Sequence, residues 1–438
     1  MAASSDARHP RTSTPRLRPS DDSSAREPHA ARAAEARTHA DDETRRRGPQ
    51  AEAAGRAAES TAERRPRRLR AAALVSRALP ALGLYAAVRG LGLVVLAVWA
   101  GAEGRSPHQL LSARWDSLWY TDIAAHGYHW AGYQATTHTR GAGAHSHLAF
   151  FPLLPWLERG LHTLTGLSYA DAGLLVSALA SLAAALGVFA VGERLAGRRA
   201  ATVLVLLWAA LPIGVLQSMA YTESLFTALA AWCLYAVLRG NWLTAGLLAA
   251  LAGITRPSAA AVIAAVWVGA ALALWRRTPG RGRAVLGALL APVGLLAYAG
   301  WVGGLSSYLD VQARWGNGFD FGAAYARFVG HQLAHSPGAG IGLLVFVGVV
   351  LWALVACVRQ RQPLPVLAYT AVIVALALGA QAYFNSKPRL LMPGFPLLLP
   401  PAAWLATLRI RRVAVAMTVL VLASAAYGAV WLLGPGPP

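Results

Sequence analysis

Residues 71–100 read AAALVSRALPALGLYAAVRGLGLVVLAVWA, an apolar run with only two charged positions. A helix of about 20 apolar residues is long enough to cross a hydrocarbon core of about 30 Å. Runs of this kind recur from residue 71 to the C-terminus, and the 438-residue chain is 56% hydrophobic and only 14% charged. Ordinary soluble domains carry about 25% charged residues. The sequence therefore predicts an all-α polytopic membrane protein.

The first 70 residues differ in composition from the rest of the chain. They mix Arg, Asp, Glu, Ser, Pro and Ala without apolar periodicity, so they cannot bury enough surface to fold. No apolar core of a signal peptide occurs before residue 71. We expect residues 1–70 to form a disordered cytoplasmic tail whose basic end, Arg64 to Arg70, contacts anionic headgroups and holds the N-terminus inside. Residues 71–438 form the multispanning domain.

The formal net charge of +20 raises the question of nucleic-acid binding. Past residue 70 the basic residues lie singly or in short clusters between apolar runs, as loop anchors do, which argues against that function. Nearly all of them are arginines, with Lys387 the one lysine, and this composition is typical of GC-rich bacteria. We therefore expect a bacterial plasma membrane protein. Cys233 and Cys357 both lie in apolar runs, which favours buried hydrophobic positions over a disulfide or a zinc site.

The membrane topology depends on the apolar stretch 148–164. If this stretch crossed the bilayer, every later arginine cluster would lie outside, against the positive-inside rule. It also contains two prolines and the adjacent charges Glu158 and Arg159. We therefore expect an external segment over 101–170, with 148–164 in the outer interface or re-entrant. About eleven spans then alternate, with the C-terminus outside, at 73–100, 171–192, 199–218, 220–239, 241–254, 257–275, 284–304, 338–358, 364–382, 389–407 and 411–433.

The charged residues sort to opposite faces in this topology. The inside loops carry arginines at 194–199, 239, 276–283, 359–361 and 409–412. The acidic residues past residue 70, apart from Glu193, all fall on or near the outer face. Because the positive-inside rule hardly constrains Asp and Glu, it does not force this asymmetry. Chemistry that needs a carboxylate base is therefore expected outside.

The segment after the first span concentrates carboxylates and aromatic residues. Ser106 and Pro107 are typical of a helix start, and Gly127 of a helix end, which predicts one helix over 107–126. Three pairs then share a face at i, i+4: Trp115 with Trp119, Asp116 with Tyr120, and Asp122 with His126. The spacing alone leaves two interpretations open, an aromatic-belt helix with solvated carboxylates or a reaction centre.

Three other outer-face patches carry polar residues, each with a structural alternative. The residues Tyr221–Ser224 begin a span, and Glu223 among them either caps the N-terminus of the helix or belongs to a functional site. Arg256 lies between two apolar runs, where it either snorkels or binds an anion. Lys387 and Arg389 place two cations just before a span, which favours a lipid phosphate or pyrophosphate over simple solvation.

Three further features remain open. Arg89 lies in mid-span and is expected to face another helix or a polar cavity. His138, His145 and His147 occupy a loop and could bind a metal, although they lack a tight helical spacing. The second external segment, 305–337, either closes over a substrate or is a plain loop.

These patches together resemble the PIG-V-type mannosyltransferases, the GPI mannosyltransferase 2-like branch of the GT-C superfamily. The resemblance covers residues 73–410, and Leu390 departs from it where an aromatic residue is expected. The motifs that carry it are Arg-Trp-Asp-Ser-Leu-Trp-Tyr…Ile-Ala…Gly-Tyr at 114–128, Phe-Phe-Pro-Leu-Leu-Pro at 150–155, Tyr-Thr-Glu-Ser-Leu-Phe at 221–226, Thr-Arg-Pro-Ser at 255–258 and Pro-Arg-Leu-Leu-Met-Pro-Gly-Phe-Pro-Leu at 388–397.

The resemblance implies a multispanning enzyme that takes a sugar, most often mannose, from a polyprenyl-phosphate donor on the outer face. It assigns the general base to an acidic residue early in the first external loop, here Asp116. The expected reaction is inverting transfer to a hydroxyl acceptor on a lipid, glycan or protein, with no cofactor required. The other expected substrate-binding residues are Arg114, Trp115, Trp119, Tyr120, Asp122, Glu223, Arg256, Lys387 and Arg389. The alternatives are a transporter or flippase of a lipid-linked sugar or other anion, and a GT-C relative that uses a different sugar or a protein acceptor.

Overall fold

The computed structural model describes residues 72–128, 146–381, 384–434 and 436, so the tail over 1–70 lies outside the described residues. Residues 74–438 form one compact unit. Within the described ranges the chain is built of helices, and the one β-type contact is an isolated bridge between Phe319 and Ala380. The predicted all-α polytopic membrane fold is confirmed.

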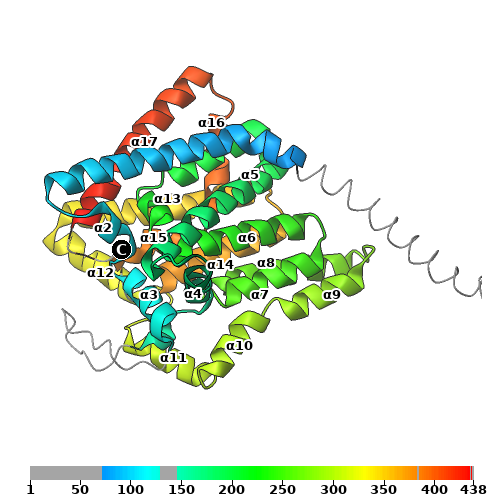
Figure 1. The fold of residues 1–438 in the computed structure, drawn as a ribbon. Coiled ribbons are helices and arrows are strands. Elements are labelled where there is room, and N and C mark those ends of the chain that lie inside the picture. Colours follow the sequence, from blue (N-terminus) through cyan, green and yellow to red (C-terminus); the bar gives the residue numbers. More distant parts are fainter. Residues whose placement is uncertain (1–71, 129–145, 382–383, 435, 437–438) are drawn as a thin grey trace, which may run out of the picture. The chain divides into compact units, whose positions relative to one another are not determined.

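Ten helical segments are apolar enough to form the membrane part (Figure 1). Five are long enough to cross a bilayer by length and composition: the first helix Ala72–Ala102, α5 Tyr169–Ala209, the α9–α10 segment Arg281–Trp301, α13 Pro337–Arg359 and α17 Ile410–Leu433. Five are shorter: α6 Thr222–Leu238, α7 Trp242–Gly253, α8 Ala259–Trp275, α14 Leu364–Gly379 and the segment Phe395–Leu405. Each predicted span overlaps one of these segments, although the number of crossings stays a prediction.

Four of the predicted spans differ in detail from the structure. The spans 171–192 and 199–218 share α5, which is kinked at Gly197, where φ is 83°. The span 284–304 consists of α9, Arg281–Leu290, and α10, Val293–Trp301, with Pro292 between them. The span 389–407 is broken into α15 Lys387–Leu391, η4 Phe395–Leu398 and α16 Leu399–Leu405. Proline removes a backbone donor and clashes with the preceding turn, which accounts for the breaks at Pro292 and Pro393.

Shorter helices connect the apolar segments: α2 Pro107–Ser112, α3 Asp116–His126, η1 His147–Ala149, α4 Leu153–Thr165, η2 Gly214–Ser218, α11 Leu305–Arg314, α12 Ala323–His335 and η3 Phe384–Ser386. The single helix expected over 107–126 is wrong, because the chain turns between α2 and α3. Its two ends are confirmed: Ser106 Oγ accepts the amide of Gln109, and Gly127 follows the last turn with a φ of 79°. In Figure 1, α4 is seen nearly end-on while α6 and α8 run across the view, so α4 does not run alongside them.

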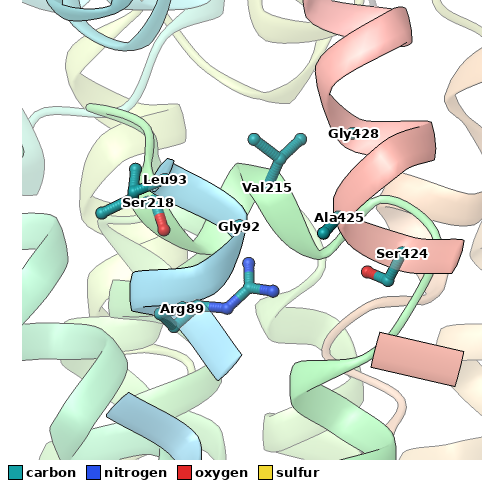
Figure 2. A pocket seen from close by; sticks show the side chains of 8 residues that line it. All are labelled: Arg89, Gly92, Leu93, Val215, Ser218, Ser424, Ala425 and Gly428. Atoms are coloured by element: carbon teal, nitrogen blue, oxygen red, sulfur yellow. The ribbon is translucent and has the colours of Figure 1, made fainter. Parts of the chain in front are cut away.

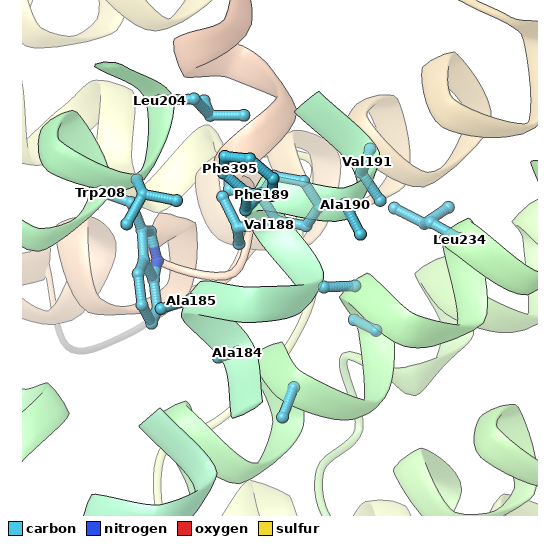
Figure 3. Close-up of a cluster of buried hydrophobic side chains, with 14 of the residues drawn as sticks. Ala184, Ala185, Val188, Phe189, Ala190, Val191, Leu204, Trp208, Leu234 and Phe395 are labelled. Atoms are coloured by element: carbon cyan, nitrogen blue, oxygen red, sulfur yellow. The ribbon is translucent and has the colours of Figure 1, made fainter. Parts of the chain in front are cut away.

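The core lies around α5 (Figure 3). Val188 and Phe189 of α5 are fully buried, and Trp208, near its C-terminal end, is fully buried as well. Phe395 from the broken segment after α15 belongs to the same cluster. The indole of Trp208 donates a hydrogen bond of 3.1 Å to the carbonyl of Met392. The chain that carries Arg389 is therefore held firmly against α5.

Arg89 of the first helix lines a small pocket with Ser218 and Ser424 (Figure 2). Its guanidinium donates to the carbonyl of Ala209 at 2.8 Å and to the carbonyl of Gly214. The last carbonyls of a helix lack partners within the helix, and in a membrane they need another donor. The expectation that Arg89 faces another helix or a polar cavity is confirmed, and the contacts show that it caps the end of α5.

Candidate functional site

The N-terminus of α6 is the centre of a buried charged cluster. Glu223 lies in the first turn of α6 and is fully buried. Its Oε1 accepts hydrogen bonds from Nη1 of Arg256, between α7 and α8, and from Nε of Arg389, on α15. The positive end of a helix dipole and two guanidinium groups together stabilise this carboxylate as an anion.

Arg389 also joins this carboxylate to a second one. Its Nη2 donates to Oδ2 of Asp116, the first residue of α3. The side chains of Arg389 and Glu223 are 10% and 0% exposed, whereas that of Asp116 is 27% exposed. The cluster of Asp116, Glu223, Arg256 and Arg389, here called the charged cluster, is thus electrically balanced, and Asp116 is its more accessible carboxylate.

Thr222 connects the charged cluster to Tyr120. Its Oγ1 accepts from Nη1 of Arg256 at 3.2 Å and lies 3.1 Å from the hydroxyl of Tyr120, which is buried. Glu223 and Thr222 both use the same nitrogen of Arg256, so most of the five N–H donors of that guanidinium are not committed to them. Arg256 therefore retains the capacity to bind an anion.

The backbone just before Asp116 has an unusual conformation. Trp115 has a φ of 53° and a ψ of −119°, outside the regions that residues with a Cβ normally adopt. The hydroxyl of Tyr221 accepts the amide of Asp116 at 3.1 Å and donates to the carbonyl of Arg114 at 3.4 Å. The guanidinium carbon of Arg389 lies 4.7 Å from the centre of the Tyr221 ring. Tyr221 belongs to the motif at 221–226, but the sequence did not predict its role. The one sequence feature that could have pointed to Tyr221 is its position two residues before Glu223.

The side chains of Arg114 and Trp115 do not join the charged cluster. Arg114 donates to the carbonyls of Leu432 and Gly434 at the C-terminal end of α17. The ring of Trp115 packs at 5.3 Å on the ring of Trp431, which also belongs to α17. The structure thus places both residues against the last helix, and their expected role in substrate binding stays a prediction.

Trp119 and Asp122 lie on other parts of α3. Trp119 stacks on Phe150 with ring centres 5.4 Å apart. Oδ2 of Asp122 lies 2.6 Å from Nε2 of buried His147, and Oδ1 lies 3.1 Å from Nδ1 of His126. Asp122 is therefore held by two histidines rather than by the charged cluster.

The metal site considered for the external loop is only partly covered by the structure. His138 and His145 lie outside the described residues. In the part of the chain that is described, no group of three or more His, Cys, Asp or Glu side chains could hold a metal ion.

Lys387 has contacts of its own, different from those of Arg389. Its ammonium donates to the carbonyl of Ala380 and lies 5.2 Å and 5.7 Å from the ring centres of Tyr325 and Phe384. Burial lowers the pKa of Lys387 to about 8, and the nearby charge of Asp320 opposes this shift. Because Tyr325 belongs to α12, the segment 305–337 packs over Lys387.

Comparisons with known proteins relate the middle of the chain to membrane mannosyltransferases. Residues 146–301 match the family described as dolichyl-phosphate-mannose-protein mannosyltransferase. The match covers about a third of the chain and includes Glu223 and Arg256, but neither Asp116 nor Arg389. No curated protein matches the sequence.

Two solved structures are similar in fold at low sequence identity. The crystal structure of ArnT from Cupriavidus metallidurans in the apo state has 16% identity and a TM-score of 0.43 over 72% of this chain and 69% of ArnT. The structure of ArnT bound to undecaprenyl phosphate has 16% identity and a TM-score of 0.45 over 80% of this chain and 75% of ArnT. At these values the function must be argued from the site itself.

Proposed function

We propose that the protein is a membrane glycosyltransferase. It transfers a hexose, with mannose as the first candidate, from a polyprenyl-phosphate donor to a hydroxyl acceptor on the outer face of the membrane. The observation that carries the proposal is the charged cluster, in which an accessible carboxylate and two arginines from distant parts of the chain meet. The match of residues 146–301 to a mannosyltransferase family supports the same reaction class.

Asp116 is the proposed general base. It takes the proton of the acceptor hydroxyl while the hydroxyl oxygen attacks the anomeric carbon of the donor. The bond between that carbon and the phosphate oxygen breaks, and polyprenyl phosphate leaves with the bonding electrons, so the anomeric centre is inverted. General-base assistance of this kind contributes about 10²–10⁴-fold to the rate.

The charge balance of the cluster suits this reaction. With both carboxylates ionised, the formal charges of the two arginines and the two acids sum to zero. When Asp116 accepts a proton, Arg389 loses its anionic partner there and the cluster gains one positive charge. In the same step the donor phosphate changes from a diester to a monoester and gains one negative charge. Arg256 and Arg389 therefore stabilise the departing phosphate when its charge develops, with no metal assigned to the step.

The finer parts of the proposal rest on the sequence motifs. The order of motifs from residue 114 to residue 397 supports a PIG-V-type branch and mannose as the sugar. Lys387 is proposed to bind the donor phosphate, and Asp122 the acceptor. The convergence of Asp116, Arg256 and Arg389 favours an enzyme over a transporter, because a transporter needs no paired base and phosphate-binding cations at one reacting centre.

The replacement Asp116→Asn tests the proposal. It keeps the shape of the side chain and removes the base, so transfer of label from radiolabelled polyprenyl-phospho-mannose in membranes should fall by about 10²–10⁴-fold. Asp310→Asn, at an exposed carboxylate of α11, is the matched control and should keep full activity.

Expression of each variant is measured by immunoblot. Transfer by Asp116→Asn at the wild-type rate would overturn the assignment of the base. If the wild type is inactive with the mannosyl donor but active with another polyprenyl-phospho-hexose, the assignment of mannose as the transferred sugar is wrong and the mechanism stands.

A further inference from the structure

The turn that carries Asp116 is strained. The φ and ψ of Trp115 are unfavourable for a residue with a Cβ, and such a conformation persists only when its surroundings hold it. The side chain at this position is a tryptophan, although glycine is the residue that adopts a φ of 53° freely. Some neighbouring group must therefore hold the turn.

Tyr221 makes two of the contacts that hold it, beside those of Ser117 Oγ with the amide and carbonyl of Arg114 and those of Arg114 and Trp115 with α17. Its hydroxyl bonds both peptide groups beside Trp115, the carbonyl of Arg114 at 3.4 Å and the amide of Asp116 at 3.1 Å. Tyr221 is fully buried, and Ser177 of α5 fixes its backbone through bonds of 3.3 Å and 3.2 Å to its amide and carbonyl. The turn is thus anchored through α6 to the central helix of the core.

The same tyrosine also contacts the ion-pair partner of Asp116. Arg389 lies over the ring of Tyr221, with its guanidinium carbon 4.7 Å from the ring centre, and it donates to Oδ2 of Asp116. The face of an aromatic ring attracts a cation placed over it, so this contact helps to hold the guanidinium in place. One side chain therefore constrains the backbone of Asp116 through its hydroxyl and the partner of the Asp116 carboxylate through its ring.

We propose that Tyr221 is a positioning residue for the transfer reaction, which acts by holding the turn at Trp115 so that the carboxylate of Asp116 faces the acceptor hydroxyl. This inference rests on the proposed function, in which Asp116 is the base. The hydroxyl of Tyr221 acts on the turn before Asp116 and not on the substrates, so its loss should lower the rate and leave donor binding intact. A misplacement of about 1 Å at a reacting group costs up to about 100-fold in rate.

Tyr221→Phe separates the two contacts, because it removes the hydroxyl and keeps the ring beneath Arg389. We expect faster hydrogen–deuterium exchange in a peptide that covers residues 113–118, since the Asp116 amide loses its acceptor. We also expect kcat for transfer from polyprenyl-phospho-mannose to fall by roughly 10- to 100-fold, with the donor KM within about twofold of the wild type.

Tyr85→Phe is the matched control. The hydroxyl of Tyr85 is also buried, and it donates to Oε1 of Gln217 at 2.9 Å, a contact away from the turn. This variant should leave exchange at residues 113–118 and kcat unchanged. An equal loss of kcat in both variants would mean that losing a buried hydroxyl lowers activity only by disturbing the fold. That result would overturn the positioning role of Tyr221.

Two further results would also overturn it: unchanged exchange at residues 113–118 in Tyr221→Phe, or faster exchange with a wild-type kcat. These outcomes can be told apart from a failure of the proposed function. If Asp116→Asn transfers sugar at the wild-type rate, Asp116 is not the general base and the proposed function fails. The exchange measurement on Tyr221→Phe needs no substrate, so it tests the turn by itself.

Discussion

At the scale of single residues, the two cations predicted to bind phosphate at the start of α15 have different surroundings. Arg389 is paired with Asp116 and Glu223, whereas Lys387 lies among a carbonyl and two aromatic rings. A carboxylate pair keeps a guanidinium charged at any accessible pH, but burial away from water disfavours an ammonium. The two residues therefore respond differently to pH.

Lys387 should give the reaction an alkaline limit. Burial lowers the pKa of Lys387 to about 8, so its positive charge is lost as the pH rises through that value, well below the ordinary value of 10.5. If Lys387 binds the donor phosphate, kcat/KM for the donor should fall above about pH 8. Lys387→Arg, which stays charged, should move this limb beyond pH 9.5.

The measurement is the pH profile of kcat/KM in native membranes. The profile of kcat should be displaced to higher pH, because a bound phosphate anion favours the charged lysine. A wild-type kcat/KM that is constant from pH 7 to pH 9.5 would exclude Lys387 from the donor site.

At the scale of helices and turns, two arginines from the segments that flank α2 bind the end of α17. Arg114 donates to the carbonyls of Leu432 and Gly434, and Arg105 donates to the carbonyl of Leu433 at 2.7 Å. The C-terminal end of a helix carries partial negative charge and unpaired carbonyls, so cations stabilise it. Binding of the helix end accounts for the positions of Arg105 and Arg114, and no ligand is needed to explain them.

Arg114→Ala should therefore destabilise the protein while leaving donor recognition intact. Hydrogen bonds to a charged group each contribute about 1.5–3 kcal/mol, so we expect clearly faster thermal inactivation and a donor KM close to the wild type. Arg105→Ala should show the same pattern to a smaller extent, because it loses one carbonyl contact instead of two. A raised donor KM in Arg114→Ala with normal stability would instead restore Arg114 to the substrate site.

Sequence patterns predicted most of the helical segments and the members of the charged cluster. The apolar runs alone locate the helices, because a bilayer imposes both their length and their composition. Asp116, Glu223, Arg256 and Arg389 were recognisable as polar residues near the ends of apolar runs. The turn at Trp115 could not be recognised from the sequence, because the i, i+4 pattern continues through it. The contacts that break the helix there come from Tyr221 and α17, which are distant in the sequence.

At the scale of the whole molecule, the proposed topology puts the arginine-rich loops inside and the charged cluster outside. Asn241, between α6 and α7, and Ser306, on α11, are both exposed and fall on opposite sides in this topology. Cys233 and Cys357 are both fully buried, so the native chain provides an unreactive background for cysteine labelling.

Cysteine labelling in intact cells tests this orientation. Ser306→Cys should react with a membrane-impermeant maleimide from outside, and Asn241→Cys only after the membrane is permeabilised. The unmodified chain serves as the control and should not react. Labelling of Asn241→Cys in intact cells would invert the topology and place the charged cluster on the cytoplasmic side.

The contacts of Arg114 have a consequence for the order of events during synthesis. Asp116 and its partner Arg389 are separated by 273 residues, and Arg114 and Leu432 by 318. At about 5–20 residues per second, the ribosome needs roughly 16–64 s to pass from Arg114 to Leu432. For that interval the turn before Asp116 exists without the helix that receives Arg114. The turn that carries Asp116 therefore lies near the start of the membrane domain and gains all of its contacts only when the last helix arrives.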